Sequence, residues 1–133
     1  MKGKLFDASA LINIMIRKGS EALKVLSGQS ILDLTIYEVG NSIWRLSYIE
    51  KKISNDQACA FLDSFLLLLQ RMKIININGM EKSVKEFSME NGLTFYDASY
   101  LVVSKTHDLI LVTDDKTLSK VALKHTKVES SDL

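Results

Sequence analysis

Short apolar segments alternate with longer helical patterns along the whole chain, and this alternation constrains the fold more than any other feature. The short segments predict β-strands at residues 4–6, 30–34, 73–77, 109–112 and 127–129. The segments between them predict helices at residues 8–17, 20–26, 36–51, 54–71, 80–91, 95–105 and 117–124. Strands that alternate with helices of ten or more residues favour a parallel sheet. We therefore expect an α/β fold with a central, mostly parallel sheet and helices on both faces.

The chain shows no internal boundary. No linker, low-complexity stretch or long charge run divides its 133 residues, so we expect one domain over residues 1–133. The N-terminus reaches an acid at Asp7 without the apolar core of a signal peptide. The longest apolar run, residues 65–69, is far shorter than the roughly 20 residues that span a bilayer. We expect a cytoplasmic protein with no membrane partner.

Charge and cysteine content exclude several kinds of site. The 17 basic and 16 acidic residues give a net charge of +1, so any nucleic acid must be bound by a local feature. A single cysteine, Cys59, excludes a disulfide framework and a cysteine-rich zinc site. With only two histidines, a histidine-based zinc site is not expected either. We expect Cys59 to pack as a small buried side chain.

Four carboxylates stand near the predicted strand ends. Asp7 ends the first strand, Glu38 lies in the first turn of the helix after the second strand, and Asp115 follows the fourth strand. Asp97 lies in the first turn of the helix that begins at residue 95. The carboxyl ends of parallel strands border the ligand crevice of such a sheet. Four carboxylates at one edge repel one another unless a cation joins them, and hard oxygen ligands suit Mg²⁺ or Mn²⁺.

Each of these acids also has a purely structural interpretation. The segments Thr35-Ile-Tyr-Glu38 and Thr94-Phe-Tyr-Asp97 resemble capping boxes, and Asp7 or Asp114 could begin a helix as its N-cap. Helix capping explains any one acid, but four acids at one edge are harder to explain in this way.

The predicted helix over residues 36–51 has two distinct faces. Asn41 and Arg45 share the face of Glu38, where Asn41 could orient a water molecule or a carboxylate, or could simply be solvated. The other side predicts a core stripe made of Ile36, Val39, Ile43, Leu46 and Ile49.

The order of four short motifs resembles the PIN domain family over essentially the whole chain. These motifs are Phe6-Asp7-Ala-Ser9, Thr35-x-x-Glu38-x-x-Asn41, Tyr96-Asp97-Ala-x-x-Leu101 and Val112-Thr113-x-Asp115. The length and the long middle helix pair look like the VapC-type toxins of toxin–antitoxin pairs.

The resemblance implies a function and a set of site residues. It makes Asp7, Glu38, Asp97 and Asp115 both the catalytic residues and the ligands of one or two Mg²⁺ or Mn²⁺ ions. Asp115 rather than the neighbouring Asp114 is the favoured fourth ligand, and Ser9, Asn41 and Thr113 match supporting polar positions. The implied activity is a divalent-metal-dependent endoribonuclease. The implied partners are an RNA substrate, a cognate VapB-type antitoxin and a second copy of the chain in a homodimer.

Two surfaces could contact partners. Lys116, Lys120 and Lys124 form a basic stripe that begins beside Asp115, which suits either phosphate contacts or a solvated helix face. The run of residues 65–69 is apolar in every direction around a helix, which one buried face cannot explain. A second apolar stripe on the preceding helix consists of Tyr37, Gly40, Trp44 and Tyr48. This excess predicts either a protein interface or two helices buried on several sides.

Other functional classes fit less well. A PIN nuclease of RNA processing or decay, without an antitoxin, would use the same acids. A phosphoacceptor receiver domain needs an acidic pair at the end of its first strand, where only Asp7 stands. A haloacid-dehalogenase-type phosphatase needs a second aspartate where Ser9 stands. A non-catalytic α/β binding module would not need all four acids.

Overall fold

The computed structural model describes residues 2–132 and has a five-stranded, entirely parallel sheet at its centre. The strand order is β3-β2-β1-β4-β5. The strands are β1 Lys4–Phe6, β2 Ser30–Leu32, β3 Lys73–Ile75, β4 Ile110–Val112 and β5 Val128–Glu129. The predicted α/β class and sheet are confirmed, although β2 and β3 end two residues earlier than predicted.

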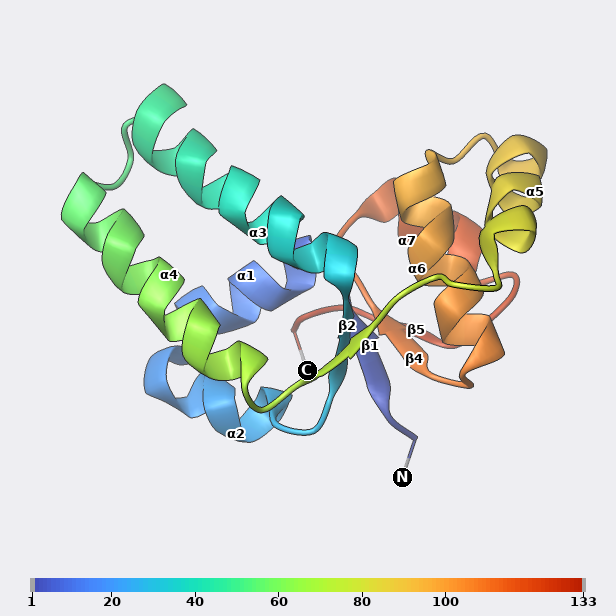
Figure 1. Cartoon of the computed structure of the whole chain (residues 1–133), viewed down its shortest axis with the longest axis horizontal. Coiled ribbons are helices and arrows are strands. Elements are labelled where there is room, and N and C mark those ends of the chain that lie inside the picture. Colours follow the sequence, from blue (N-terminus) through green and yellow to red (C-terminus); the bar gives the residue numbers. More distant parts are fainter. Residues whose placement is uncertain (1, 133) are drawn as a thin grey trace.

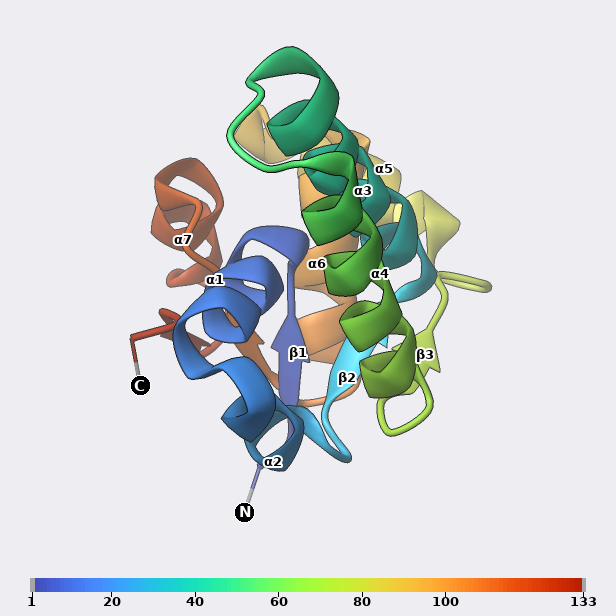
Figure 2. The ribbon, with the colours of Figure 1, turned by 90° about the vertical axis from the view of Figure 1, so that its left-hand side faces the viewer.

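Within residues 2–132, seven α-helices cover the two faces of this sheet, and Figure 1 shows their arrangement. One side carries α1 Ala8–Lys18, α2 Ala22–Leu26, α3 Asp33–Trp44 and α4 Asn55–Leu69. The other side carries α5 Glu81–Asn91, α6 Phe95–Thr106 and α7 Lys116–Ala122. Figure 2 shows α3 and α4 lying side by side, with α1 and α2 in front of the sheet.

Two cores form because successive residues of a strand point to opposite faces. Phe6, Ile31 and Val112 pack with side chains of α1, α3 and α4 in one core. The neighbouring strand residues pack with α5, α6 and α7 in the other; they are Leu5, Leu32 and Leu111. Burial on both faces explains why the strands are continuous apolar runs rather than alternating patterns.

Several helix ends follow the sequence signals. The Ser54 side chain accepts a hydrogen bond from the backbone of Gln57, whose own side chain returns to the Ser54 N–H. This is the predicted capping box, and α4 begins directly after it. Gly92 ends α5 in the left-handed conformation at φ 63°, which glycine adopts without steric cost.

The start of α3 differs from the prediction. The helix begins at Asp33, and the Leu32 N–H donates to Oγ1 of Thr35 at 3.1 Å. Thr35 is therefore the third residue of the helix, so the predicted Thr35–Glu38 capping box is wrong. Glu38 consequently lies in the second turn of α3 and not in its first.

The far end of this helix also departs from a regular pattern. After Trp44 a single π-helical turn, η2 (Arg45–Ile49), forms, in which Glu50 N–H donates to the Arg45 carbonyl at 2.9 Å. A π-turn inserts an extra residue into the helical repeat, so the side chains beyond it rotate away from the predicted face. Ile49, predicted as core, is the last residue of this turn and is 56% exposed, so the core stripe ends before it.

No helix among residues 2–132 is both long enough and apolar enough to cross a membrane.

Candidate active site

Strand order brings the predicted acids to one edge of the sheet. Asp7 directly follows β1, the helix that carries Glu38 follows β2, and Asp115 begins the helix after β4. Since β1 lies between β2 and β4, these three acids follow adjacent strands at their carboxyl ends. Asp97 is contributed by the first turn of α6, which packs against β1 and β4. The edge beside β1 is also where the strand order reverses, the usual ligand position in such sheets.

Asp7 is buried and held rigidly. Its Oδ1 accepts from the Ser9 hydroxyl at 2.8 Å and from the Ala10 N–H at 2.9 Å, which also caps α1. Its Oδ2 accepts a hydrogen bond from the Thr113 hydroxyl. Thus Ser9 and Thr113, expected as supporting residues, both contact this acid. Three donors leave part of the carboxylate's capacity for about four hydrogen bonds or ligand contacts unused.

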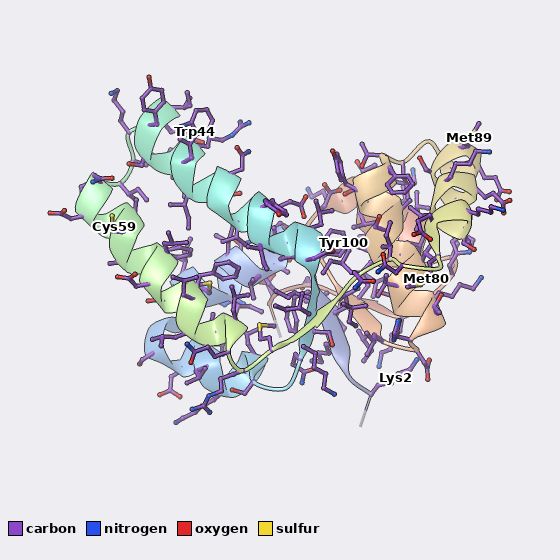
Figure 3. All side chains as sticks on the ribbon, viewed as in Figure 1. Lys2, Trp44, Cys59, Met80, Met89 and Tyr100 are labelled. Carbon is purple, nitrogen blue, oxygen red and sulfur yellow. The ribbon has the colours of Figure 1, made fainter. Side chains whose placement is uncertain are left out.

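Glu38 is positioned by a buried tyrosine. The Tyr100 hydroxyl donates to Oε1 of Glu38 at 2.5 Å and lies 2.7 Å from the Thr35 hydroxyl. Tyr100 is 1% exposed and connects α6 to the start of α3, as its position in Figure 3 shows. Only one of the two Glu38 carboxylate oxygens is engaged, so Oε2 remains free among the described residues.

The acids influence one another electrostatically. Burial raises the pKa of Asp97 above its ordinary value, and the charges of Asp115 and Asp7 raise it further. Burial also raises the pKa of Glu38, to which the charges of Asp7 and Asp97 add, although the Tyr100 hydrogen bond opposes them. Within residues 2–132, no lysine or arginine forms an ion pair with any of these four acids. The edge is therefore a concentration of negative charge that no ion pair within residues 2–132 offsets.

The neighbouring residues Asp114 and Asp115 have different hydrogen-bond partners. Asp114 accepts from the Ser131 N–H at 2.8 Å and from the Asn13 amide at 2.6 Å. Burial alone would raise the pKa of Asp114, but these hydrogen bonds outweigh it and lower the pKa. Asp115 is the N-cap of α7, where its Oδ1 accepts from the Leu118 N–H at 2.9 Å. The expectation that Asp114 caps this helix is wrong by one residue.

The oxygen atoms at this edge fit a hard divalent cation in chemistry. Every candidate ligand is a carboxylate, and Glu38 and Asp115 each keep one oxygen free while the chain holds the other. Over residues 2–132, however, no three of these side chains are close enough to ligate one ion together. Mg²⁺ usually keeps several water ligands and is bound through one or two carboxylates, so such a direct three-ligand site is not required.

Two hollows adjoin the acids, one lined by Glu38 and the other by Asp115. A hollow of about 660 Å³ beside Glu38, the Glu38 hollow, is lined by Ala8, Ser9, Leu34, Tyr37, Glu38, Asn41, Ser42 and Tyr96. A second one, of about 650 Å³, contains Asp115 together with Arg17, Lys116 and Lys120. We call it the Asp115 hollow. The predicted basic stripe is shorter than expected, because α7 ends at Ala122 and Lys124 lies beyond it.

Tyr100 is the residue of the candidate site that motif reasoning missed. It follows Asp97 by three residues, so both side chains lie on one side of α6. That spacing was a signal, but an aromatic residue in an apolar helix is usually only core. Its partner Glu38 is 62 residues away in sequence, and no local pattern reveals the contact.

Replacement of Tyr100 by phenylalanine is expected to lower the free energy of unfolding by about 1–3 kcal/mol, because the buried Thr35 hydroxyl loses a partner. Urea denaturation measures this loss. Tyr48→Phe, on a 68% exposed ring, is the control and should change stability by no more than about 0.5 kcal/mol. Equal effects of the two substitutions would show that the Tyr100 hydroxyl contributes nothing to the site's rigidity.

Comparison with known proteins gives consistent matches. Residues 4–124 match the family profile of the PIN domain. The chain is 34% identical to exonuclease VapC9 of Pyrobaculum aerophilum, over 86% of this chain and 81% of that protein. It is 30% identical to ribonuclease VapC1 of Mycobacterium tuberculosis, over 85% of this chain and 86% of that one.

Solved structures show the same fold. The crystal structure of PAE2754 from Pyrobaculum aerophilum has a TM-score of 0.77 and 31% identity, over 96% of this chain and 89% of that one. A toxin–antitoxin complex from Klebsiella pneumoniae has a TM-score of 0.57 and 23% identity, over 85% and 87% of the two chains. With the family profile and the relatives taken together, this chain belongs to the PIN domain family.

Proposed function

We propose that the protein is a divalent-metal-dependent endoribonuclease and the toxin of a VapBC-type pair. The observation that carries this proposal is the mutual electrostatic influence of Asp7, Glu38, Asp97 and Asp115 at one sheet edge, where none of the four forms an ion pair within residues 2–132. The names of the relatives, exonuclease and ribonuclease, support a nuclease. The choice of Mg²⁺ or Mn²⁺, the RNA substrate, internal cleavage, action as one domain over residues 1–133 and a cytoplasmic location all belong to the proposal.

The side chains of this edge would hold and orient the reacting groups. A bound divalent cation supplies positive charge, which activates water and offsets the charge that builds on the phosphate oxygens. Asp7 is fixed by three hydrogen bonds, Glu38 by the Tyr100 hydroxyl, and Asp115 by the Leu118 N–H at the N-terminus of α7. Rigid carboxylates of this kind reduce the reorganisation needed when cation and phosphate enter together.

The test is cleavage of a mixed-sequence, single-stranded RNA by the pure protein with Mg²⁺, Mn²⁺ or EDTA. Fragments of several internal lengths in the presence of either ion, and none in EDTA, are the expected result. Release of single nucleotides from one end would instead identify an exonuclease. No cleavage with any ion, together with no heat of Mn²⁺ binding in calorimetry, would leave only the non-catalytic binding module.

A protein partner is supported by the exposed apolar surface of the α3–α4 pair. Trp44 and Tyr48 stack at 5.7 Å between ring centroids, and both are exposed. Figure 3 shows Trp44 at the far end of α3 from Tyr100. On α4, Leu66 and Leu67 are exposed although Phe65 and Leu68 are buried. Patches of this kind mark protein contacts more often than free surface. We assign this surface to the antitoxin and the homodimer.

The predicted burial of Cys59 is wrong, because Cys59 lies exposed on α4.

Trp44→Ala or Leu67→Ala is expected to weaken self-association or antitoxin binding by about tenfold or more, since aromatic and large apolar anchors dominate interfaces. Light scattering gives the mass in solution, and titration with the antitoxin gives its affinity. Leu123→Ala is the matched control, because Leu123 is 61% exposed against 63% for Leu67 but lies beyond α7. The interface assignment is wrong if both variants behave like this control.

A further inference from the structure

We propose that the Glu38 hollow is a subsite for one unpaired nucleobase of the RNA, which stacks on Tyr37 and Tyr96. This inference rests on the proposed nuclease function and names the part of the substrate that the hollow binds.

The position of the hollow connects it to the acids. Its lining includes Glu38 itself and Ser9, whose hydroxyl donates to Asp7. Tyr37 immediately precedes Glu38, and Tyr96 immediately precedes Asp97. Two helices from distant parts of the chain thus each contribute an acid to the site and an aromatic ring to the hollow next to it.

The two rings are available for stacking. Tyr37 is 77% exposed and Tyr96 is 60% exposed, unusually high values for rings that line a concave surface. Neither ring stacks on another aromatic side chain within residues 2–132, where the aromatic pairs are Trp44–Tyr48 and Phe87–His125. The predicted stripe of Tyr37, Trp44 and Tyr48 is therefore divided: Tyr37 lies at the acidic edge, and the other two rings form a separate stacked pair. Stacking of bases on exposed rings is a common way to bind single strands.

The two hollows differ in their charged residues, and this difference indicates which part of the RNA each would contact. The Glu38 hollow has no lysine or arginine among its lining residues, and its polar groups include the Asn41 amide and the Ser42 hydroxyl. An amide both donates and accepts hydrogen bonds, which suits the edge of a neutral base. The Asp115 hollow is lined by Arg17, Lys116 and Lys120 and also by Asp114, Asp115 and Asp132, and Arg17 pairs with Asp132. Neither lysine forms an ion pair within residues 2–132, which leaves both available to contact phosphate. A strand that crosses the acids would therefore place a base on the Glu38 side and backbone phosphates on the Asp115 side.

The arrangement favours single-stranded RNA over a protein segment as occupant. Glu38 lines the hollow, and the charges of Asp7 and Asp97 are close enough to raise its pKa. A substrate must reach these acids, whereas a protein partner has the apolar α3–α4 surface available. A base inside a duplex is stacked on its neighbours and does not expose its face to these rings.

The location is tested by photocrosslinking. Single-stranded RNA that carries 5-iodouracil is irradiated with the wild-type protein in EDTA, which prevents cleavage, and the crosslinked peptides are identified by mass spectrometry. Crosslinks at Tyr37 or Tyr96 are the expected result. Crosslinks confined to Trp44, Tyr48 or other positions overturn the subsite.

Cleavage kinetics provide the second test, with alanine and phenylalanine variants of both tyrosines. Tyr37→Ala and Tyr96→Ala are each expected to raise KM for mixed-sequence RNA about tenfold, with a smaller change in kcat. Tyr37→Phe and Tyr96→Phe keep the ring and should restore the wild-type KM. Met89→Ala removes a large exposed side chain of α5 that lines neither hollow, and it should leave KM for RNA unchanged.

The outcomes separate the two proposals. If wild-type protein cleaves RNA but the alanine variants keep its KM, the nuclease stands and the subsite is wrong. If wild-type protein neither cleaves nor crosslinks RNA, both proposals are wrong. If the alanine variants lose affinity for the antitoxin but not for RNA, the hollow is a protein contact and the subsite is wrong.

Discussion

Asp97→Asn is expected to reduce metal-dependent RNA cleavage by at least about a thousandfold, which corresponds to about 4 kcal/mol of transition-state stabilisation. Asparagine keeps the size of the side chain but removes one negative charge from the edge. No hydrogen bond from residues 2–132 reaches the Asp97 carboxylate. The backbone N–H of Asp97 donates to the Thr94 hydroxyl, and the substitution leaves that bond in place. The substitution should therefore leave the fold intact while it weakens the attraction for a cation.

Stability should change in the opposite direction to activity. Burial and the charges of Asp115 and Asp7 raise the pKa of Asp97, so its ionised form is unfavourable in the folded metal-free protein. Without metal at neutral pH, the asparagine variant should melt at the same or a higher temperature than wild type. Asp63→Asn, on the exposed side of α4, is the control and should retain full activity. Cleavage near the wild-type rate by the Asp97 variant would remove Asp97 from the site.

Metal removal is expected to abolish cleavage and to reveal an unusual pH dependence of stability. Burial raises the pKa of Asp7, Glu38 and Asp97 above their ordinary values. A carboxyl group with a raised pKa stabilises the folded state fully below its unfolded pKa, near pH 4 for these residues. That contribution is lost as the pH rises through the raised pKa of the folded state. Metal-free protein should therefore be more stable at about pH 5 than at about pH 7.5.

The pKa of Asp114 does not reverse this trend. It is lowered, so its contribution is lost only when the pH falls below about 4, outside this window.

Added Mn²⁺ should reverse the pH trend, because a cation binds ionised carboxylates and offsets their repulsion. Thermal melting at both pH values, with EDTA or with Mn²⁺, gives the measurement. The gain from Mn²⁺ should be larger at about pH 7.5 than at about pH 5 in wild type. It should be smaller in Asp97→Asn at both values. A metal-free protein whose melting temperature rises steadily over this range, with no response to Mn²⁺, would contradict an acidic cation site.

Local sequence patterns were reliable where the structure depends on neighbouring residues. The Ser54–Gln57 capping box and the left-handed Gly92 each involve residues only a few positions apart. The order of the elements follows from their apolar periodicity, and the parallel sheet follows from that order. Reasoning of the same local kind failed at Thr35. Its hydroxyl accepts from the Leu32 N–H and hydrogen-bonds with the Tyr100 hydroxyl, and it does not cap a helix that starts after it.

The sequence by itself therefore determined the α/β class, the family and the four acids near strand ends. These features depend on periodicity and short motifs, which involve residues close together along the chain. Only the tertiary structure decided which neighbours fix those acids. Thr113 reaches Asp7 across 106 residues, and Tyr100 reaches Glu38 across 62. Asp114 differs from Asp115 because it accepts hydrogen bonds from Ser131 and Asn13, which are distant in sequence and close to it only in the folded chain. The physical reason is that a buried polar atom must find a partner in space, and its position is set by packing and not by spacing along the chain.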